Sequence, residues 1–261
     1  MNNEIKNKIA IVTGGSEGIG FAIANALSLK GAKVLIVSRN KKKLEIAKKI
    51  IKSKNGIIDY FIGDVSNKKT AEKVVNKCNK LWGSADILIN NAGGPPPGKL
   101  LDHKDDEWEK AINTNLLSVI RFSRSVIPAM KIKKWGRIIS ISSTIAKEPS
   151  PPMILSATSR AGVMSFSKTL AIEFAEFNIT TNVISVGGVL TKRLTNLIQN
   201  EAKDKNKNFK KLFSDIKNTI PAKRFAEPNE IANTALFLCS KDAGYINGQN
   251  LTIDGALTKG Y

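Results

Sequence analysis

A glycine-rich segment near the N-terminus has the spacing of a phosphate-binding turn. It reads Thr13-Gly14-Gly15-Ser16-Glu17-Gly18-Ile19-Gly20 and lies between a short apolar run and a stretch of helical character. Gly14 permits a tight turn, Gly18 lets the backbone approach a pyrophosphate, and Gly20 lets a helix pack closely on a strand. The first N–H groups of that helix would face the anion. The segment therefore predicts a dinucleotide site.

The residues after the second apolar run bear on the choice of dinucleotide. An acidic residue there would accept hydrogen bonds from a ribose 2′-hydroxyl and favour NAD, but the chain reads Val37-Ser38-Arg39-Asn40. The guanidinium of Arg39 suits a 2′-phosphate, although the carboxylate of Glu17 would repel that phosphate. We predict that NADP(H) is preferred over NAD(H), with Arg39 as the discriminating residue.

Histidine and cysteine are too sparse for several other kinds of site. The chain has one histidine, His103, and two cysteines, Cys78 and Cys239, which lie far apart in the sequence. Zinc sites built on paired histidines are excluded, and no disulfide framework or metal site is expected. His103 could replace a missing catalytic acid, but beside Lys104 and Asp105 it is expected at the surface.

Apolar runs of strand length alternate with longer segments of helical length. The expected strands are residues 9–12, 33–37, 57–62, 86–89, 137–141, 180–185 and 250–253. The expected helices are residues 18–30, 41–53, 68–81, 107–127, 155–177 and 227–240, the fourth ending at Pro128 or shortly after. Such alternation predicts an α/β protein with a doubly wound, Rossmann-type sheet, mostly seven-stranded and parallel, and helices on both faces.

The chain length suits one domain of this kind. It has 261 residues and no repeat or linker, so we predict a single dinucleotide-binding domain over residues 1–261. A lysine-rich segment, residues 199–218, interrupts the alternation. It is expected to be either a solvated surface helix or part of a mobile lid inserted at about 190–218.

The formal net charge of +19 raises the question of an anionic partner. The lysines are scattered over expected helix surfaces and accompany no nucleic-acid-binding motif, so nucleic acid is the weakest hypothesis and is not expected as a partner. No window of about 18 apolar residues is present, and no membrane partner is predicted. A reduced, cytoplasmic protein is the simplest expectation.

Beyond the glycine-rich turn, further motifs resemble the short-chain dehydrogenases/reductases over nearly the whole chain. Asn90-Asn91-Ala92-Gly93 follows the fourth expected strand, and Pro228-x-Glu230-Ile231-Ala232 resembles the 3-oxoacyl-(acyl-carrier-protein) reductase branch. The resemblance implies a homotetramer and a small-molecule or acyl-thioester substrate. It implies cofactor contacts from Gly14, Ser16, Gly18, Ile19, Arg39, Asp64, Val65, Asn91, Gly93, Arg160, Gly187 and Thr191.

The resemblance fails at the residues where the chemistry is expected. Asn115 matches the family's structural asparagine, and Ser143 matches its catalytic serine. Thirteen residues further on, however, Ser156 and Arg160 stand where the family has its Tyr-x-x-x-Lys pair. The chain therefore resembles a divergent subgroup that lacks this pair. The candidate catalytic residues are Asn115, Ser143, Ser156 and Arg160, with Arg160 also expected to hold the nicotinamide ribose.

Two functions remain open from the sequence. In carbonyl reduction a proton must reach the oxygen, and a serine hydroxyl is a far weaker acid than tyrosine. Ser143 could orient a carbonyl while water or a substrate group relays the proton, in an oxidoreductase that acts on a carbonyl/alcohol pair. Alternatively, the chain is a catalytically weak or inactive dinucleotide-binding sensor or scaffold. The stiff segment Gly94-Pro95-Pro96-Pro97-Gly98 is expected to wall the substrate pocket.

Overall fold

The structure, a computed structural model, describes residues 3–260 and contains one seven-stranded parallel sheet. The strands are β1 (Ile9–Thr13), β2 (Lys33–Ser38), β3 (Ile57–Ile62), β4 (Ile87–Asn90), β5 (Gly136–Ser143), β6 (Ile179–Val186) and β7 (Asn250–Ile253). Their order is β3-β2-β1-β4-β5-β6-β7, so the direction of winding reverses between β1 and β4. The predicted doubly wound α/β fold is confirmed, and its switch point is where such sheets bind ligands.

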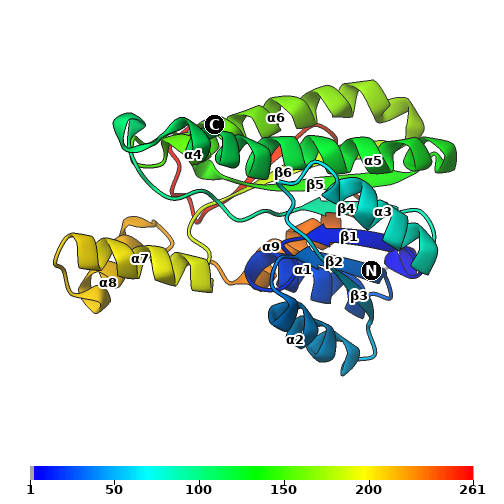
Figure 1. The fold of residues 1–261 in the computed structure, drawn as a ribbon, viewed down its shortest axis with the longest axis horizontal. Helices are drawn as coiled ribbons and strands as arrows, with labels where there is room; N and C mark the ends of the chain where they lie inside the picture. Colours follow the sequence, from blue (N-terminus) through cyan, green and yellow to red (C-terminus); the bar gives the residue numbers. More distant parts are fainter. Residues whose placement is uncertain (1–2, 261) are drawn as a thin grey trace.

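Helices lie on both faces of the sheet (Figure 1). Alternate residues of each strand point to opposite faces and pack with different helices. Ala10 and Val12 pack with α1, α2 and α9, whereas Ile9 and Ile11 pack toward α3, α5 and α6. These helices are α1 (Gly18–Leu29), α2 (Lys41–Lys52), α9 (Pro228–Leu238), α3 (Thr70–Leu81), α5 (Ser118–Lys133) and α6 (Ile154–Phe174). Helices therefore cover both faces and bury the sheet.

The long helix expected over 107–127 is two helices with a wider turn between them. Helix α4 (Asp105–Ile112) leads into a π-helical segment, Asn113–Leu117, which continues directly into α5. The prediction that the helix ends at or just after Pro128 is wrong, because α5 continues to Lys133. Ile127 and Met130 are buried against the sheet side of α5. Their burial offsets the backbone hydrogen bond that proline cannot make.

Two helices project from the body at the predicted insertion (Figure 1). Helices α7 (Lys192–Asp204) and α8 (Phe209–Thr219) form a hairpin, so the segment is two helices rather than one. Residues of these helices form a small apolar cluster with two residues that follow α8: Ile198, Ala202 and Leu212 with Ile220 and Phe225. We call α7 and α8 the helical lobe. Its movement as a lid stays a prediction.

Short 3₁₀ segments complete the secondary structure at Asn3–Ile5, Leu100–Asp102, Thr144–Ala146 and Ala175–Phe177. Across the described stretch 3–260, no helix combines the length and apolar character needed to cross a membrane.

Candidate active site

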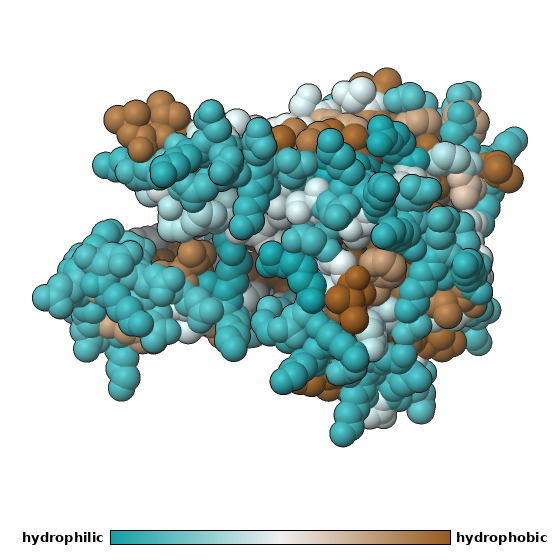
Figure 2. Space-filling model, viewed as in Figure 1, coloured by the Kyte–Doolittle hydropathy of each residue, from teal (hydrophilic) through white to brown (hydrophobic). Residues whose placement is uncertain are grey.

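All the predicted site residues line one cleft at the carboxyl ends of the strands. The cleft has a volume of about 860 Å³ and runs from the glycine-rich turn to the helical lobe. Figure 2 shows the hollow between the largely hydrophilic lobe and the body of the molecule. The sequence-predicted residues along it are Gly14, Ser16, Gly18, Ile19, Arg39, Asp64, Val65, Asn91, Gly93, Asn115, Ser143, Ser156, Arg160, Gly187 and Thr191. The fold therefore brings the predicted cofactor and catalytic sets into one continuous site.

The glycine-rich turn is held by the residue after β4. The Asn91 backbone N–H donates to the Thr13 hydroxyl at 2.9 Å, and its side-chain amide donates to the carbonyls of Thr13 and Gly14 at 3.3 Å. Gly14 has φ +60°, and a Cβ there would overlap the Asn91 carbonyl. A Cβ at Gly20 would likewise overlap the Gly14 carbonyl. Glycine is thus required by close backbone packing, which leaves the N-terminus of α1 open to the cleft.

The end of β2 presents hydroxyl and cationic groups to the cleft. The Ser16 hydroxyl donates to the Ser38 hydroxyl at 3.0 Å, and the Arg39 side chain is 74% exposed. The carboxylate of Glu17, expected to oppose a phosphate, forms a 2.7 Å ion pair with Lys43. Lys43 lies in the first turn of α2 and was not among the predicted residues, although it also lines the cleft. The ion pair offsets the repulsion that Glu17 would otherwise exert.

Asp64, after β3, is fixed as a carboxylate. Its Oδ1 accepts hydrogen bonds from the Ser66 backbone N–H at 2.9 Å and from the Ser66 hydroxyl at 2.8 Å. Partial burial alone would raise the pKa of Asp64, but these hydrogen bonds and the Arg39 charge outweigh it and lower the pKa. The 3.6 Å pair with Arg39 is exposed, and exposed pairs of this length contribute little to stability. Arg39 is therefore available to another anion.

At the opposite end of the cleft, the catalytic candidates come from β5 and α6. Ser143 is the last residue of β5, and its hydroxyl accepts from the Ile145 N–H at 3.4 Å. Ser156, in the first turn of α6, is buried, and its hydroxyl oxygen accepts from Arg160 Nε at 3.2 Å. Arg160 lies one turn further along and also donates from Nη1 to the Ile141 carbonyl at 3.0 Å. Ser156 and Arg160 thus form a hydrogen-bonded pair on one face of the helix.

The charge of Arg160 is maintained despite its surroundings. Burial and, to a smaller degree, the positive charge of Arg193 lower the pKa of Arg160 to about 10. The side chain therefore remains cationic near neutral pH. It can donate hydrogen bonds to an oxygen and stabilise negative charge on that oxygen.

Asn115 lies behind this pair, in the π-helical segment. Its side chain is buried and its amide donates to the Ser159 hydroxyl at 3.4 Å. Its Oδ1 is buried and has no hydrogen-bond partner among the described residues. The wider π turn displaces one residue relative to an α-helix, and π turns often occur at functional sites. The amino-acid sequence gave no signal for this turn.

The loop after β6 and the start of α7 close the third side of the cleft. The Gly187 N–H donates to the Ile253 carbonyl at 3.0 Å, which fixes the loop to β7. The Thr191 hydroxyl caps α7 by accepting from the Leu194 N–H at 3.3 Å. Arg193, which sequence reasoning did not select, donates to the Pro95 carbonyl at 3.1 Å. This contact links the helical lobe to the proline-rich segment, confirming that both lie at the same cleft.

The expectation that His103 is a surface residue is wrong. Its side chain is only 3% exposed, and its Nδ1 lies 3.3 Å from the Glu107 carboxylate. A Cβ on Gly98 would overlap the imidazole, so the absence of a side chain there makes the room in which His103 is buried. His103 is not among the residues that line the cleft, and nothing places it as a substitute acid.

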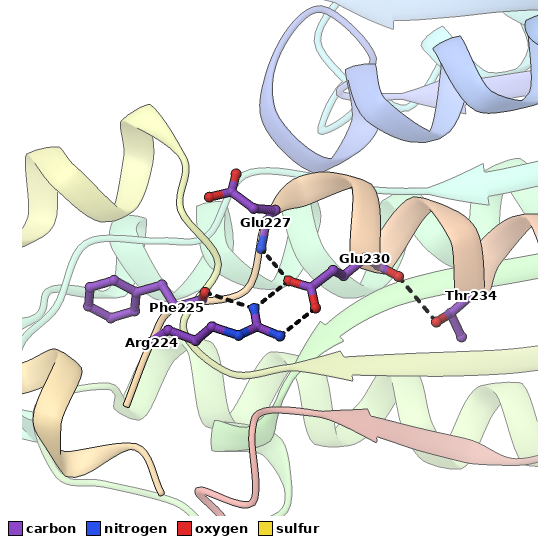
Figure 3. Close-up of polar contacts among 5 residues, drawn as sticks. All are labelled: Arg224, Phe225, Glu227, Glu230 and Thr234. Atoms are coloured by element: carbon purple, nitrogen blue, oxygen red, sulfur yellow. Dashed lines mark hydrogen bonds and ion pairs between the residues drawn. The ribbon is translucent and has the colours of Figure 1, made fainter. Parts of the chain in front are cut away.

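The base of the helical lobe is fixed by an ion pair on the surface (Figure 3). The Arg224 guanidinium donates two hydrogen bonds to the Glu230 carboxylate, at 2.6 and 2.7 Å, and Glu230 also accepts from the Glu227 N–H at 2.8 Å. The adjacent Phe225 ring packs edge-on against Phe213 of α8, with centroids 5.0 Å apart. The sequence motif around Glu230 thus anchors the lobe to α9.

Residues 3–260 contain no group of three or more His, Cys, Asp or Glu side chains that could hold a metal ion. The side chains that line the cleft include hydroxyls, guanidinium groups, ammonium groups and carboxylates.

Comparison with known proteins identifies the family. A family model described as enoyl-(acyl carrier protein) reductase matches residues 14–258. The chain is 36% identical to the 3-oxoacyl-(acyl-carrier-protein) reductase of Haemophilus influenzae over 253 residues, covering 97% of this chain and 99% of the relative. It is 34% identical to the 2,3-dihydro-2,3-dihydroxybenzoate dehydrogenase of Bacillus subtilis over 256 residues, covering 98% of each.

A solved structure shows the same relationship in three dimensions. L-sorbose reductase from Gluconobacter frateurii, complexed with NADPH and L-sorbose, superposes with a TM-score of 0.95 at 32% identity and covers 100% of both chains. The order of the strands, the glycine-rich turn tied to Asn91, and these likenesses over nearly the whole length lead to one conclusion: the chain belongs to the short-chain dehydrogenase/reductase family of oxidoreductases.

Proposed function

We propose that the protein is an NADP(H)-preferring oxidoreductase that acts on the carbonyl/alcohol pair of a small-molecule or acyl-thioester substrate. The observation on which this rests is the hydrogen bond between Arg160 and Ser156, in the same cleft as the glycine-rich turn. The pair lies where the family resemblance expects tyrosine and lysine, and it retains both a hydroxyl and a cation. Relatives that act on 3-oxoacyl and sugar substrates support a carbonyl substrate.

The residues present fit a phosphorylated dinucleotide. The close-packed Gly14–Gly20 turn, opened by the absence of Cβ atoms, accommodates a pyrophosphate, and Arg39 with neighbouring Lys43 suits a 2′-phosphate. Asp64 and Val65 would hold the adenine end, while Asn91 and Gly93 would line the path toward the nicotinamide. Thr191 and Gly187 would contact the nicotinamide end, and Arg160 its ribose. When bound, NADP(H) supplies or accepts the hydride.

The proton must be handled by this chain's hydroxyls and by solvent. Ser156 accepts a hydrogen bond from Arg160, so its own O–H is directed to another acceptor, such as the substrate oxygen. Arg160 would stabilise negative charge developing on that oxygen, and Ser143 would orient the carbonyl. During reduction the oxygen receives its proton from water or from a substrate group through the Ser156 hydroxyl. Asn115 would support α6 through its hydrogen bond to Ser159.

The test compares the native pair with the pair common in the family. We expect the wild type to oxidise NADPH with at least one member of a panel of 3-oxoacyl, sugar, quinone and steroid carbonyls. If only an efficient acid is lacking, the double variant Ser156→Tyr/Arg160→Lys should be faster, by up to about 10²–10⁴-fold. NADPH titration and thermal unfolding of the double variant serve as controls for folding.

The second candidate is a dinucleotide-binding sensor or scaffold, and the Ser156/Arg160 replacement is the observation that favours it. A wild type that binds NADPH, reduces no carbonyl in the panel and gains activity only in the double variant would support the sensor. A wild type that turns over and is slowed by the double change would establish a working variant site.

We further propose that the protein assembles as a homotetramer. The outer surfaces of α5 and α6 expose Ile132 and Ile172, at 87% and 72%, and such apolar side chains are commonly covered in oligomers. We expect light scattering at micromolar concentration to give four times the mass of the chain. A monomer under those conditions would contradict the proposal.

A further inference from the structure

Two guanidinium groups converge at the substrate end of the cleft. A Cβ at Gly94 would lie 2.7 Å from Arg193 Nη2 and 3.6 Å from Arg160 Nη2. Both side chains therefore reach the same point beside the loop that follows β4, although one comes from α7 and the other from α6. Because Gly94 has no side chain, the space between the loop and the two guanidiniums is left open toward the cleft.

These like charges face each other without a carboxylate between them. Within residues 3–260, neither Arg160 nor Arg193 forms an ion pair with an acidic residue. Glu107, which also lines the cleft, is hydrogen-bonded to the His103 imidazole and the Lys104 N–H. Burial lowers the pKa of Arg160, and the charge of Arg193 lowers it further. Two cations held together at an energetic cost stabilise an anion that bridges them.

Some guanidinium N–H donors have no acceptor within the described chain and can bind an anion. Arg160 uses Nε for Ser156 and Nη1 for the Ile141 carbonyl, and its Nη2 has no protein acceptor among the described residues. Arg193 uses Nη2 for Pro95, and its Nε and Nη1 have no acceptor in the described chain. Guanidinium groups match the geometry of a carboxylate, which each can bind through one or both oxygens.

The location relative to Ser156 limits where that carboxylate is attached. Arg160 contacts the Ser156 hydroxyl at 3.2 Å through the same guanidinium that faces Gly94. A carboxylate bound beside Gly94 therefore lies within a few bonds of a carbonyl held at Ser156. The cofactor phosphates are expected at the other end of the cleft, at the glycine-rich turn and Arg39.

Resting on the proposed function, we propose that the substrate is a carbonyl compound bearing a carboxylate one or two carbons from the carbonyl, a 2-oxo or 3-oxo acid. The free Nε and Nη1 of Arg193 donate to this carboxylate, and the positive charge of Arg160 stabilises it while its remaining donor serves the ribose and the carbonyl oxygen. Arg193 is then a specificity-determining residue. Its position in the first turn of α7 couples recognition of the acid to the placement of the helical lobe over the cleft.

The experiment measures binding, so it does not depend on turnover. Isothermal titration calorimetry first determines the affinity of wild type, Arg193→Gln and Lys203→Gln for NADP⁺. Each NADP⁺ complex is then titrated with 2-oxohexanoate, with 3-oxohexanoate and with the methyl ester of each, so that each acid is compared with an ester that differs in the charge. Lys203 is exposed on the same helix and outside the cleft, so its variant controls for the general loss of one positive charge.

We expect wild type to bind the acid about 10–100-fold more tightly than the ester, as loss of a charge-assisted contact implies. Arg193→Gln should remove this preference without changing the affinity for NADP⁺, and Lys203→Gln should retain it. Arg193→Lys, which keeps the charge but not the planar group, should retain part of it.

Equal binding of acid and ester by wild type, or no saturable binding of either at millimolar concentration, would overturn the inference. The inference would also be overturned if Arg193→Gln weakened the binding of acid and ester equally. That result would mean that Arg193 only holds the loop through its hydrogen bond to the Pro95 carbonyl. If NADP⁺ itself does not bind, the proposed function fails as well. A protein that binds NADP⁺ but shows no preference for the acid loses only the inference about substrate.

Discussion

The two ends of the cleft are built in different ways. The cofactor end is built around the backbone of a short glycine-rich segment, where missing Cβ atoms at Gly14 and Gly20 let this loop contact the one after β4, and side chains such as Arg39 and Asp64 also line it. The substrate end is made by side chains that arrive from β5, α6, α7 and the proline-rich segment. The first end depends on local sequence and can be recognised from it. The second depends on which elements the fold places side by side.

This difference explains how one end can diverge while the other is retained. Replacing a glycine in the turn forces backbone atoms to overlap, so the turn has few alternatives. Ser156 and Arg160 contribute side chains rather than backbone to the site, so replacing them forces no overlap of backbone atoms. The family's dinucleotide turn can therefore coexist with an unusual pair of residues at the place of reaction.

The largest effect is expected at the substrate end. Ser143→Ala and Arg160→Ala should each lower kcat, by about 10²–10⁴-fold for a group that handles the proton or the developing charge. NADPH affinity should change much less in Ser143→Ala than in Arg160→Ala, because Arg160 is also expected to contact the ribose. Steady-state kinetics with the best carbonyl of the panel, together with NADPH titration, measure both. An unchanged kcat in both variants would show that neither Ser143 nor Arg160 takes part in the chemical step.

At the cofactor end, Gly20→Val should disrupt the turn itself. The new side chain would overlap the Gly14 carbonyl and the Asn91 amide, a backbone clash that we expect to cost about 3 kcal/mol. Urea unfolding should show the loss of stability, and NADPH binding should be abolished or greatly weakened. Gly93→Ala is the folding control, since a Cβ there has no atom within 4 Å. Normal stability of Gly20→Val would show that the two loops separate easily.

Arg39→Ala should separate the two dinucleotides. Loss of one charge-assisted contact to the 2′-phosphate should weaken NADPH binding by about 1.5–3 kcal/mol and leave NADH binding nearly unchanged. Fluorescence titration of both cofactors measures the difference. Lys42→Ala, a change of an exposed lysine in the first turn of α2 that is not part of the cleft, controls for net charge. Equal affinities of the wild type for NADPH and NADH would contradict the assignment.

The smallest effect concerns the anchor of the helical lobe. Hydrogen bonds from Arg224, followed by the Glu227 N–H and the Arg224 charge, lower the pKa of Glu230 to about 2. Because the carboxylate has a lower pKa when folded, its stabilising contribution is present above its ordinary pKa and is lost as the pH falls toward 2. Glu230→Gln should slightly lower the Tm at pH 7, with the difference from wild type shrinking below about pH 4. A difference independent of pH would contradict this origin.

Particular residues show how far sequence reasoning reaches. Alternating apolar runs and the Gly14–Gly20 spacing predicted the sheet and the dinucleotide turn, because both are local properties. The same pattern did not give strand order, and it missed the continuation of α5 beyond Pro128. There, burial of Met130 against the sheet outweighs a local rule.

At the site, the residues that were missed act through partners distant in sequence. Lys43, on the next helix, neutralises the negative charge of Glu17 through an ion pair. The burial of His103 depends on the absence of a side chain at Gly98. Arg193 lies two residues after the predicted Thr191, yet only the folded chain shows that it meets Arg160 beside Gly94. Such convergence has no signature in spacing along the chain.

The separate apolar cluster inside the helical lobe has a consequence for how the protein opens. Since Ile198 and Leu212 of the lobe belong to a cluster separate from the cores on both faces of the sheet, we expect the lobe to detach while those cores stay intact. Amide hydrogens in α7 and α8 should then exchange together, at a free energy well below that of global unfolding. An anion that bridges Arg193 of α7 and Arg160 of α6 would slow amide exchange in the lobe and leave exchange in the strands unaffected. Binding of the ligand could therefore be followed by the protection of amide hydrogens in α7 and α8.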